Sequence, residues 1–207
     1  MVKVELTILL LIGTFSAVIS QQKVKISVYY ETKCIDSRTF FLRQLGPTYE
    51  RLHQYIDLEL VPFGNVQVYK QNDGSYHYTC QHGPDECWAN RVQACAISHT
   101  DQKTSLNYAV CMFNPSNYGN TRAYAQPCAE RNGLNWQQIS TCFNGDEGEK
   151  LIEHNWSKTY YLNPPHNFIP WIVINDRHSY NQQQESFGHL FDYLCDNYLT
   201  NVPECAY

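Results

Sequence analysis

An apolar segment at residues 24–30 leads, after a short turn, to a single cysteine, Cys34, and then to a segment with helical spacing. Residues 23–30 alternate and are rich in Val, Ile and Tyr, which predicts a β-strand, whereas residues 37–56 carry apolar side chains at the spacing of a helix. Gly46-Pro47 predicts a kink or a break in that helix. The order strand, turn, cysteine, helix places the Cys34 thiol at a helix N-terminus, where backbone N–H groups favour the reactive thiolate.

A second apolar segment, residues 57–63, follows the helix and is predicted to be another strand. The order β-α-β favours a parallel pair with a right-handed crossover, and therefore an α/β fold. Cys34 then lies at the carboxyl end of the first strand, where open α/β sheets place their ligand sites. Residues 168–174 are predicted to form a further strand, and residues 185–199 a terminal helix packed on the sheet.

The N-terminal residues 1–20 have the features of a secretory signal peptide: one lysine, a short apolar core and small residues before Gln21. No later segment approaches the roughly 20 apolar residues of a membrane helix, so we predict a mature chain, residues 21–207, that is secreted and not inserted in a membrane. The net charge is −5 and no basic cluster is present, which argues against a nucleic-acid partner.

The chain contains nine cysteines, which after a signal peptide predict an oxidising compartment and a disulfide framework. Residues 66–159 are polar and hold six of them, so we interpret this region as a disulfide-bonded insertion. The odd count leaves at least one thiol over, and we interpret Cys34 as that thiol; a bridged Cys34 with another free cysteine is the alternative. The connectivity stays open, with Cys195–Cys205 the first expected pair. The disulfide candidates are Cys80, Cys87, Cys95, Cys111, Cys128, Cys142, Cys195 and Cys205.

Two other local patterns concern a possible metal site and a glycosylation site. Imidazole and thiolate both suit zinc, so His77, Cys80 and His82 are conceivable ligands. In a cysteine-rich secreted chain a disulfide is favoured at Cys80, and we predict no metal. Asn155-Trp156-Ser157 is the only N-x-S/T sequon and predicts an N-glycan on a surface loop.

Several motifs are spread over nearly the whole mature chain. They are Tyr29-Tyr30-Glu31, Phe40-Phe41, Gln44-Leu45-Gly46-Pro47, DLELVPFGN at 57–65, Cys80-Gln81-His82-Gly83 with Glu86-Cys87, Asn90 and Cys95, Pro164-Pro165-His166, and IPWIVIN at 169–175. Together they resemble the gamma-interferon-inducible lysosomal thiol reductase (GILT) family, and the signature that begins at Cys80 is the most specific.

The resemblance implies a single domain with a thioredoxin-like fold, in which a helical, disulfide-bonded insertion separates the second and third core strands. The core would comprise about residues 21–65 and 160–207, and the insertion about 66–159. It also implies that Pro170 is a cis-proline facing Cys34. Family members reduce protein disulfides with a Cys-x-x-Cys pair, typically at acidic pH in the endocytic pathway, so the endosome–lysosome lumen is the alternative to secretion.

The tetrad of this chain is Cys34-Ile35-Asp36-Ser37, so the resolving cysteine of the family maps onto Ser37. A hydroxyl cannot release a mixed disulfide, because that step needs a second thiolate. Ser37 can still donate a hydrogen bond to the Cys34 thiolate and keep its pKa low. His166 and His178, near the predicted cis-proline strand, are further candidates for tuning that pKa.

Three functional hypotheses follow. We favour a secreted protein that has kept the fold, lost most dithiol turnover and acts by binding another protein, with exposed tyrosines supplying the surface. The alternative is a monothiol oxidoreductase in which Cys34 attacks a protein disulfide. It would bind no cofactor and use an external thiol such as cysteine or glutathione as reductant. A third possibility is a trap that forms a lasting mixed disulfide. The candidate surface tyrosines are Tyr69, Tyr76, Tyr78 and Tyr118.

Overall fold

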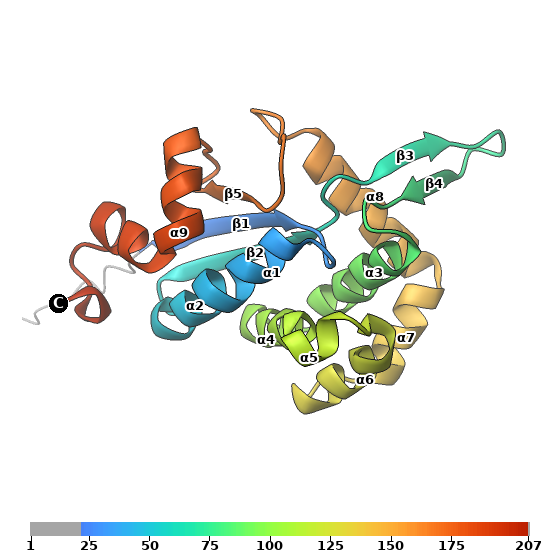
Figure 1. The fold of residues 1–207 in the computed structure, drawn as a ribbon, viewed down its shortest axis with the longest axis horizontal. Helices are drawn as coiled ribbons and strands as arrows, with labels where there is room; N and C mark the ends of the chain where they lie inside the picture. Colours follow the sequence, from blue (N-terminus) through green and yellow to red (C-terminus); the bar gives the residue numbers. More distant parts are fainter. Residues whose placement is uncertain (1–21, 207) are drawn as a thin grey trace, which may run out of the picture.

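The computed structural model describes residues 22–206, so the predicted signal peptide at residues 1–20 lies outside the described residues. A three-stranded sheet in the order β2-β1-β5 runs through the molecule (Figure 1). Strand β1 (Val24–Tyr30) pairs in parallel with β2 (Ile56–Pro62) and antiparallel with β5 (Trp171–Ile174). The predicted β-α-β unit with a parallel pair is therefore confirmed.

The helical segment after Cys34 comprises α1 (Ile35–Phe40), a π-helical turn (Phe41–Leu45) and α2 (Gly46–Leu52). The sequence predicted a kink or a break at Gly46-Pro47. No break occurs, and the chain stays helical through both residues. The irregularity takes the form of the π turn, in which the Gly46 N–H donates to the carbonyl of Phe41 five residues earlier. Widening the helix just before Pro47 accommodates a residue that has no N–H to donate.

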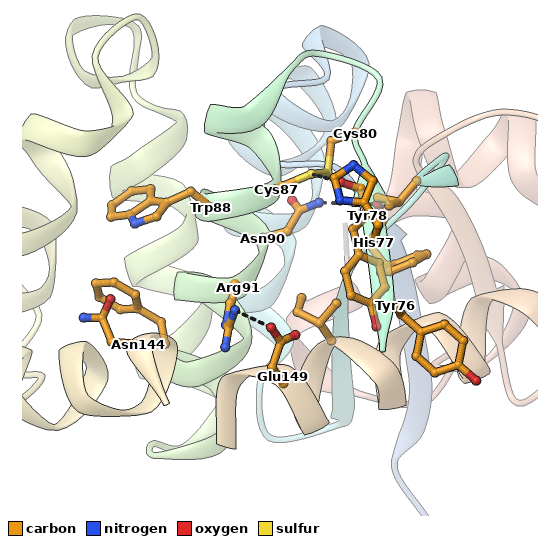
Figure 2. Close-up of a pocket in the computed structure, with 14 residues that line it drawn as sticks. Tyr76, His77, Tyr78, Cys80, Cys87, Trp88, Asn90, Arg91, Asn144 and Glu149 are labelled. Carbon is orange, nitrogen blue, oxygen red and sulfur yellow. Dashed lines mark hydrogen bonds and ion pairs between the residues drawn. A yellow bond between two sulfur atoms is a disulfide. The ribbon is translucent and has the colours of Figure 1, made fainter. Parts of the chain in front are cut away.

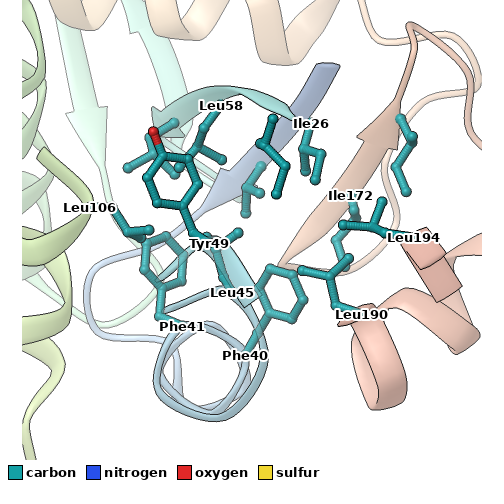
Figure 3. Packing of buried hydrophobic residues seen from close by; sticks show 14 of the residues in the cluster. Ile26, Phe40, Phe41, Leu45, Tyr49, Leu58, Leu106, Ile172, Leu190 and Leu194 are labelled. Atoms are coloured by element: carbon teal, nitrogen blue, oxygen red, sulfur yellow. The ribbon is translucent and has the colours of Figure 1, made fainter. Parts of the chain in front are cut away.

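One face of the sheet packs against α1, the π turn and α9 (Tyr180–Asn197). In Figure 3, Phe40 and Leu45 point from the helical segment toward Ile26, and Leu190 and Leu194 approach from α9. The rings of Phe40 and Phe187 stack with their centroids 6.0 Å apart, which joins the two helical elements directly. A short 3-10 helix, Pro203–Cys205, follows α9.

A long insertion separates β2 from β5 and begins with an antiparallel hairpin, β3 (Gln67–Lys70) and β4 (Tyr76–Thr79). The prediction of a helical insertion omitted this hairpin, because its strands are short, polar and largely exposed and lack a clear apolar alternation. Six helices follow: α3 (Pro84–Ser98), α4 (Gln102–Phe113), α5 (Pro115–Tyr118), α6 (Thr121–Arg131), α7 (Trp136–Asn144) and α8 (Asp146–Tyr160).

The insertion packs against the sheet through α3, α4 and α8, which contact β2. On the face opposite Phe40, the Ser27 hydroxyl donates to Glu59 Oε2 at 2.7 Å, and Lys158 of α8 forms an ion pair with the same carboxylate. Because the sheet is covered on both faces, six of the seven residues of β1 are buried.

Four disulfides are present: Cys80–Cys87, Cys95–Cys142, Cys111–Cys128 and Cys195–Cys205. Three lie within the insertion and the fourth ties α9 to the C-terminal 3-10 helix. Among the described cysteines, Cys34 alone forms no disulfide. Within residues 22–206, no helix combines the length and the apolar character needed to cross a bilayer.

Candidate functional site

Cys34 lies directly before α1, at the carboxyl end of β1, and only 9% of its surface is exposed. Its thiol donates a hydrogen bond to the carbonyl oxygen of Ile169, with Sγ and O 3.6 Å apart. This hydrogen bond places the segment that contains Pro170 beside the cysteine, and the Ile169–Pro170 peptide bond is cis. Ser37 is fully buried in the first turn of α1.

Burial raises the pKa of the Cys34 thiol above its ordinary value, because a thiolate loses its hydration there. Hydrogen bonds from the Ser37 N–H and hydroxyl and from the Asp36 N–H lower the pKa, and the nearby charge of Glu31 raises it. The helix N-terminus and Ser37 thus act in the direction expected from the sequence. Desolvation outweighs them, so the expectation of a low pKa for Cys34 is corrected.

Alkylation of Cys34 is expected to be slow at neutral pH and to accelerate as the pH rises. An unperturbed thiol with a pKa of about 8.5 is only about 3% thiolate at pH 7, and a raised pKa leaves less. We expect iodoacetamide to modify folded Cys34 at least about tenfold more slowly at pH 7 than in denaturant. Mass spectrometry across pH 6–10 measures this, with Ser37→Ala as a slower variant. Equal rates in the folded and unfolded chains would contradict it.

Tyr118 of α5 covers the turn that leads into Cys34. Its hydroxyl donates to the carbonyl of Lys33, and its ring lies beneath the guanidinium of Arg38, whose Cζ is 5.3 Å from the ring centroid. The sequence-based expectation of an exposed tyrosine is therefore wrong for Tyr118. Of the four tyrosines predicted to be exposed, Tyr69 is at 54% exposure, and Tyr76 and Tyr78, like Tyr118, are partly buried.

The groups that shift the pKa of Cys34 do not include His166 or His178, so the role in tuning that pKa considered for these histidines finds no support. His178 stacks on Trp171, and its Nδ1 lies 2.9 Å from the carbonyl oxygen of Ile172. Burial lowers the pKa of both histidines, which favours the neutral ring.

The residues before Cys34 are held by side chains of α3. Asn90 Oδ1 accepts hydrogen bonds from the N–H and the hydroxyl of Thr32, at 3.1 and 2.8 Å. Glu86 Oε2 accepts from the N–H of Lys33 at 3.2 Å. In the sequence, Glu86 and Asn90 stand out only as parts of a family motif. Their spacing of four residues, which places both side chains on one face of a helix, is the sequence feature that could have indicated their shared role.

Glu31, His82 and Glu86 form a compact group beside this turn that sequence reasoning did not identify. Both carboxylates are buried and the imidazole lies between them and the solvent. Burial raises the pKa of Glu31 to about 7; the charge of Glu86 adds to this rise, while the N–H of Asn65 and His82 oppose it. His77 and Cys80, which the sequence suggests together with His82 as conceivable zinc ligands, are not in the group, and Cys80 is bound in a disulfide.

A pocket of about 400 Å³ lies between the β3–β4 hairpin, α3 and the start of α8. Figure 2 shows Tyr76 and Tyr78 on one side, Trp88 on the other and the Cys80–Cys87 disulfide between the hairpin and α3. Arg91 is paired with Glu149 at 3.0 Å. The cysteines that line this pocket are both oxidised, so thiol chemistry resides at Cys34.

The sequon asparagine Asn155 lies within α8 rather than on a surface loop, and it is 8% exposed. Its Nδ2, the atom a glycan would occupy, donates to the carbonyl of Pro62 at 3.3 Å. We therefore expect the folded protein to carry no glycan at Asn155. Protein secreted by a glycosylating cell should show no mass change on treatment with a peptide N-glycosidase. A loss of mass that disappears in Asn155→Gln would contradict this.

Two solved structures illustrate the likeness of this fold to known ones. A putative protein disulfide isomerase from Nitrosomonas europaea superposes with a TM-score of 0.57, covers 86% of this chain and 100% of its own, and is 9% identical. Oxidoreductase DsbA from Xylella fastidiosa superposes with a TM-score of 0.55, covers 86% of this chain and 87% of its own, and is 16% identical. These likenesses show that the fold is thioredoxin-like, as expected.

Sequence comparisons identify nearer relatives. The family model for gamma interferon inducible lysosomal thiol reductase (GILT) matches residues 25–132. The gamma-interferon-inducible lysosomal thiol reductase of Carassius auratus is 36% identical over 182 residues, which are 87% of this chain and 70% of that protein. GILT-like protein 1 of Drosophila melanogaster is 31% identical over 206 residues, covering 93% of this chain and 82% of its own. The chain therefore belongs to the gamma-interferon-inducible lysosomal thiol reductase family.

Proposed function

We propose that this protein keeps the family fold but has lost most dithiol reductase turnover with the replacement of the resolving cysteine by Ser37, and that it acts mainly by binding another protein. The observation that carries the proposal is the state of Cys34. Its thiol is buried, donates a hydrogen bond to Ile169 and lies beside a hydroxyl where a second thiol would be needed. Each of these features disfavours the cycle of attack and release.

The segment that runs past Cys34 supplies a surface for a protein partner. A pocket of about 480 Å³ is lined there by Pro164, Pro165, Asn167, Phe168, Trp171, His178, Ser179 and Tyr180. Tyr180, which lines this pocket, is 74% exposed, and Ile35, which follows Cys34 in the chain and lies outside the pocket lining, is 55% exposed. Exposed aromatic and aliphatic side chains around a concave site are typical of protein interfaces. We propose that the partner is a protein of the secretory or endosome–lysosome lumen, reached through the signal peptide.

A monothiol oxidoreductase is the second candidate, favoured by the donors that surround Cys34 Sγ, namely the N–H groups of Asp36 and Ser37 and the Ser37 hydroxyl. In this cycle the Cys34 thiolate attacks a substrate disulfide and expels one substrate thiolate. A small thiol then attacks Cys34 Sγ, which releases the second substrate thiol. A second small thiol regenerates Cys34, so that one protein disulfide is reduced and two small thiols are oxidised.

The deciding experiment measures reduction of a denatured disulfide-bonded protein by the mature chain, with cysteine or glutathione at acidic and at neutral pH. If the protein acts mainly by binding, we expect the native chain to reduce this substrate no faster than Cys34→Ser. A native chain that clearly exceeds Cys34→Ser would replace the binding proposal with the monothiol enzyme. Chromatography of both proteins with a candidate partner, under non-reducing conditions, reports binding separately from covalent capture.

A further inference from the structure

We propose that Glu31, His82 and Glu86 form a binding site for a divalent transition-metal ion, with Zn²⁺ the best match. The site lies between the turn after β1 and the start of α3. It does not involve the Cys34 thiol, so it stands or falls independently of the function proposed above.

The three side chains place one donor atom each within reach of a single ion. Nδ1 of His82 lies 2.7 Å from Glu86 Oε2 and 3.3 Å from Glu31 Oε2, and one donor atom of each residue lies within 4.8 Å of the others. Tetrahedral zinc with bonds of about 2.0–2.1 Å places neighbouring donors about 3.3 Å apart. The pair of His82 and Glu31 already has this separation, and side-chain rotation that opens the contact between His82 and Glu86 would bring the three atoms around one ion.

The other carboxylate oxygens are fixed by the backbone. Glu31 Oε1 accepts from the N–H of Asn65 at 2.5 Å, and Glu86 Oε1 accepts from the N–H of His82 at 3.1 Å. Such outer contacts orient carboxylate ligands in metal sites. Glu31 Oε2 is left buried without a hydrogen bond and faces the imidazole. A metal ion would supply the partner that this oxygen lacks.

Charge also favours a cation. The two carboxylate side chains are 1% and 0% exposed, and within the described part of the chain no lysine or arginine forms an ion pair with either. A buried carboxylate charge without a compensating partner is costly. A divalent ion balances both, with neutral imidazole as the third ligand.

The ligand types and the access route narrow the choice of ion. One imidazole nitrogen with two carboxylate oxygens suits Zn²⁺ better than Ca²⁺ or Mg²⁺, which prefer all-oxygen shells. The His82 side chain is 36% exposed, so the ion can enter past it and a water molecule can complete the tetrahedron. The resulting bridge would join the Cys34 turn to the insertion.

A second group in the same chain provides a matched control. His99 Nε2 lies 2.8 Å from Glu147 Oε1, with Cys142 beside them. Cys142 is bonded to Cys95 and has no thiolate to offer, which leaves only two donors. This group thus contains a histidine–glutamate pair, as the group at His82 does, but it lacks a third ligand.

The test is titration of the metal-free mature chain, in the Cys34→Ser background, with Zn²⁺ alone by calorimetry and with Co²⁺ by visible absorption. We expect one ion per chain, a nitrogen–oxygen Co²⁺ spectrum, and affinity reduced at least about 100-fold in His82→Ala, since losing a residue bound to the metal costs at least as much affinity as losing one of its outer contacts. His99→Ala should bind like its parent. Glu31→Gln, if folded by circular dichroism, should also bind weakly.

Absence of Zn²⁺ binding by the parent chain would overturn the proposal. Equal affinities of His82→Ala and its parent would overturn it as well, as would loss of binding in His99→Ala, which would move the ion to the other group. Because His82 is partly exposed, His82→Ala is expected to fold, so failure of a buried glutamate variant to fold does not remove the test.

Discussion

Replacing Ser37 with cysteine is expected to raise the rate of protein disulfide reduction at least about 100-fold at millimolar external thiol, because an internal thiol can act at an effective concentration far above that of any reagent. Strain in a four-residue loop lowers this advantage but does not abolish it. Ser37 Oγ already contacts Cys34 Sγ, so a sulfur at this position lies where the mixed disulfide must be attacked. The measurement is turnover on a denatured disulfide-bonded protein.

The double variant Cys34→Ser with Ser37→Cys is the control, because it has the new thiol but lacks the nucleophile. It is expected to remain at the background rate. If Ser37→Cys gains nothing over the native chain while circular dichroism and stability are unchanged, then the buried Cys34, rather than the missing thiol, limits the chemistry, and the scaffold itself has lost the activity.

Replacing Gly64 with alanine is expected to destabilise the protein by at least about 3 kcal/mol, the sum of left-handed backbone strain and overpacking in a rigid site. Gly64 has φ +68°, and a Cβ there would lie 2.2 Å from Cγ of Glu31. That side chain cannot move away easily, because Oε1 is held by the N–H of Asn65 and the residue is fully buried. Urea unfolding measures the loss.

Gly74→Ala is the matched comparison. Gly74 also has a positive φ, +89°, but nothing lies within 4 Å of the Cβ position. Only the backbone term remains, so the expected loss is about 1 kcal/mol. Similar losses in the two variants would show that the contact with Glu31 contributes little and that backbone strain accounts for both.

The core of the fold could be predicted from the sequence because its signals are local. The alternation in β1, the helical spacing after Cys34 and the apolar run at β5 each report a nearby element, and short βαβ connections have a favoured hand. The β3–β4 hairpin was missed because Tyr76–Thr79 contributes little apolar surface. The π turn at Phe41–Leu45 was missed because proline marks an irregularity without specifying its form.

The electrostatic state of the site could not be predicted in the same way. The helix N-terminus and Ser37 are visible in the sequence, whereas the desolvation of Cys34 depends on how deeply the thiol is buried, which no local pattern reports. The carboxylates of Glu31 and Glu86 meet across 55 positions of the chain, with His82 between them in space. Likewise, the sequon at Asn155 indicates a chemical motif and carries no information about burial.

The turn that presents Cys34 depends on groups from outside the thioredoxin-like core. The N–H of Thr32 bonds to Asn90, the N–H of Lys33 bonds to Glu86, and the carbonyl of Lys33 accepts from Tyr118. All three partners belong to the insertion. A core without the insertion would leave these three main-chain groups of the turn before Cys34 without their hydrogen-bond partners. The insertion thus completes the surroundings of the Cys34 turn, and transplanting the tetrad Cys34–Ser37 alone onto another thioredoxin-like scaffold would not reproduce this environment.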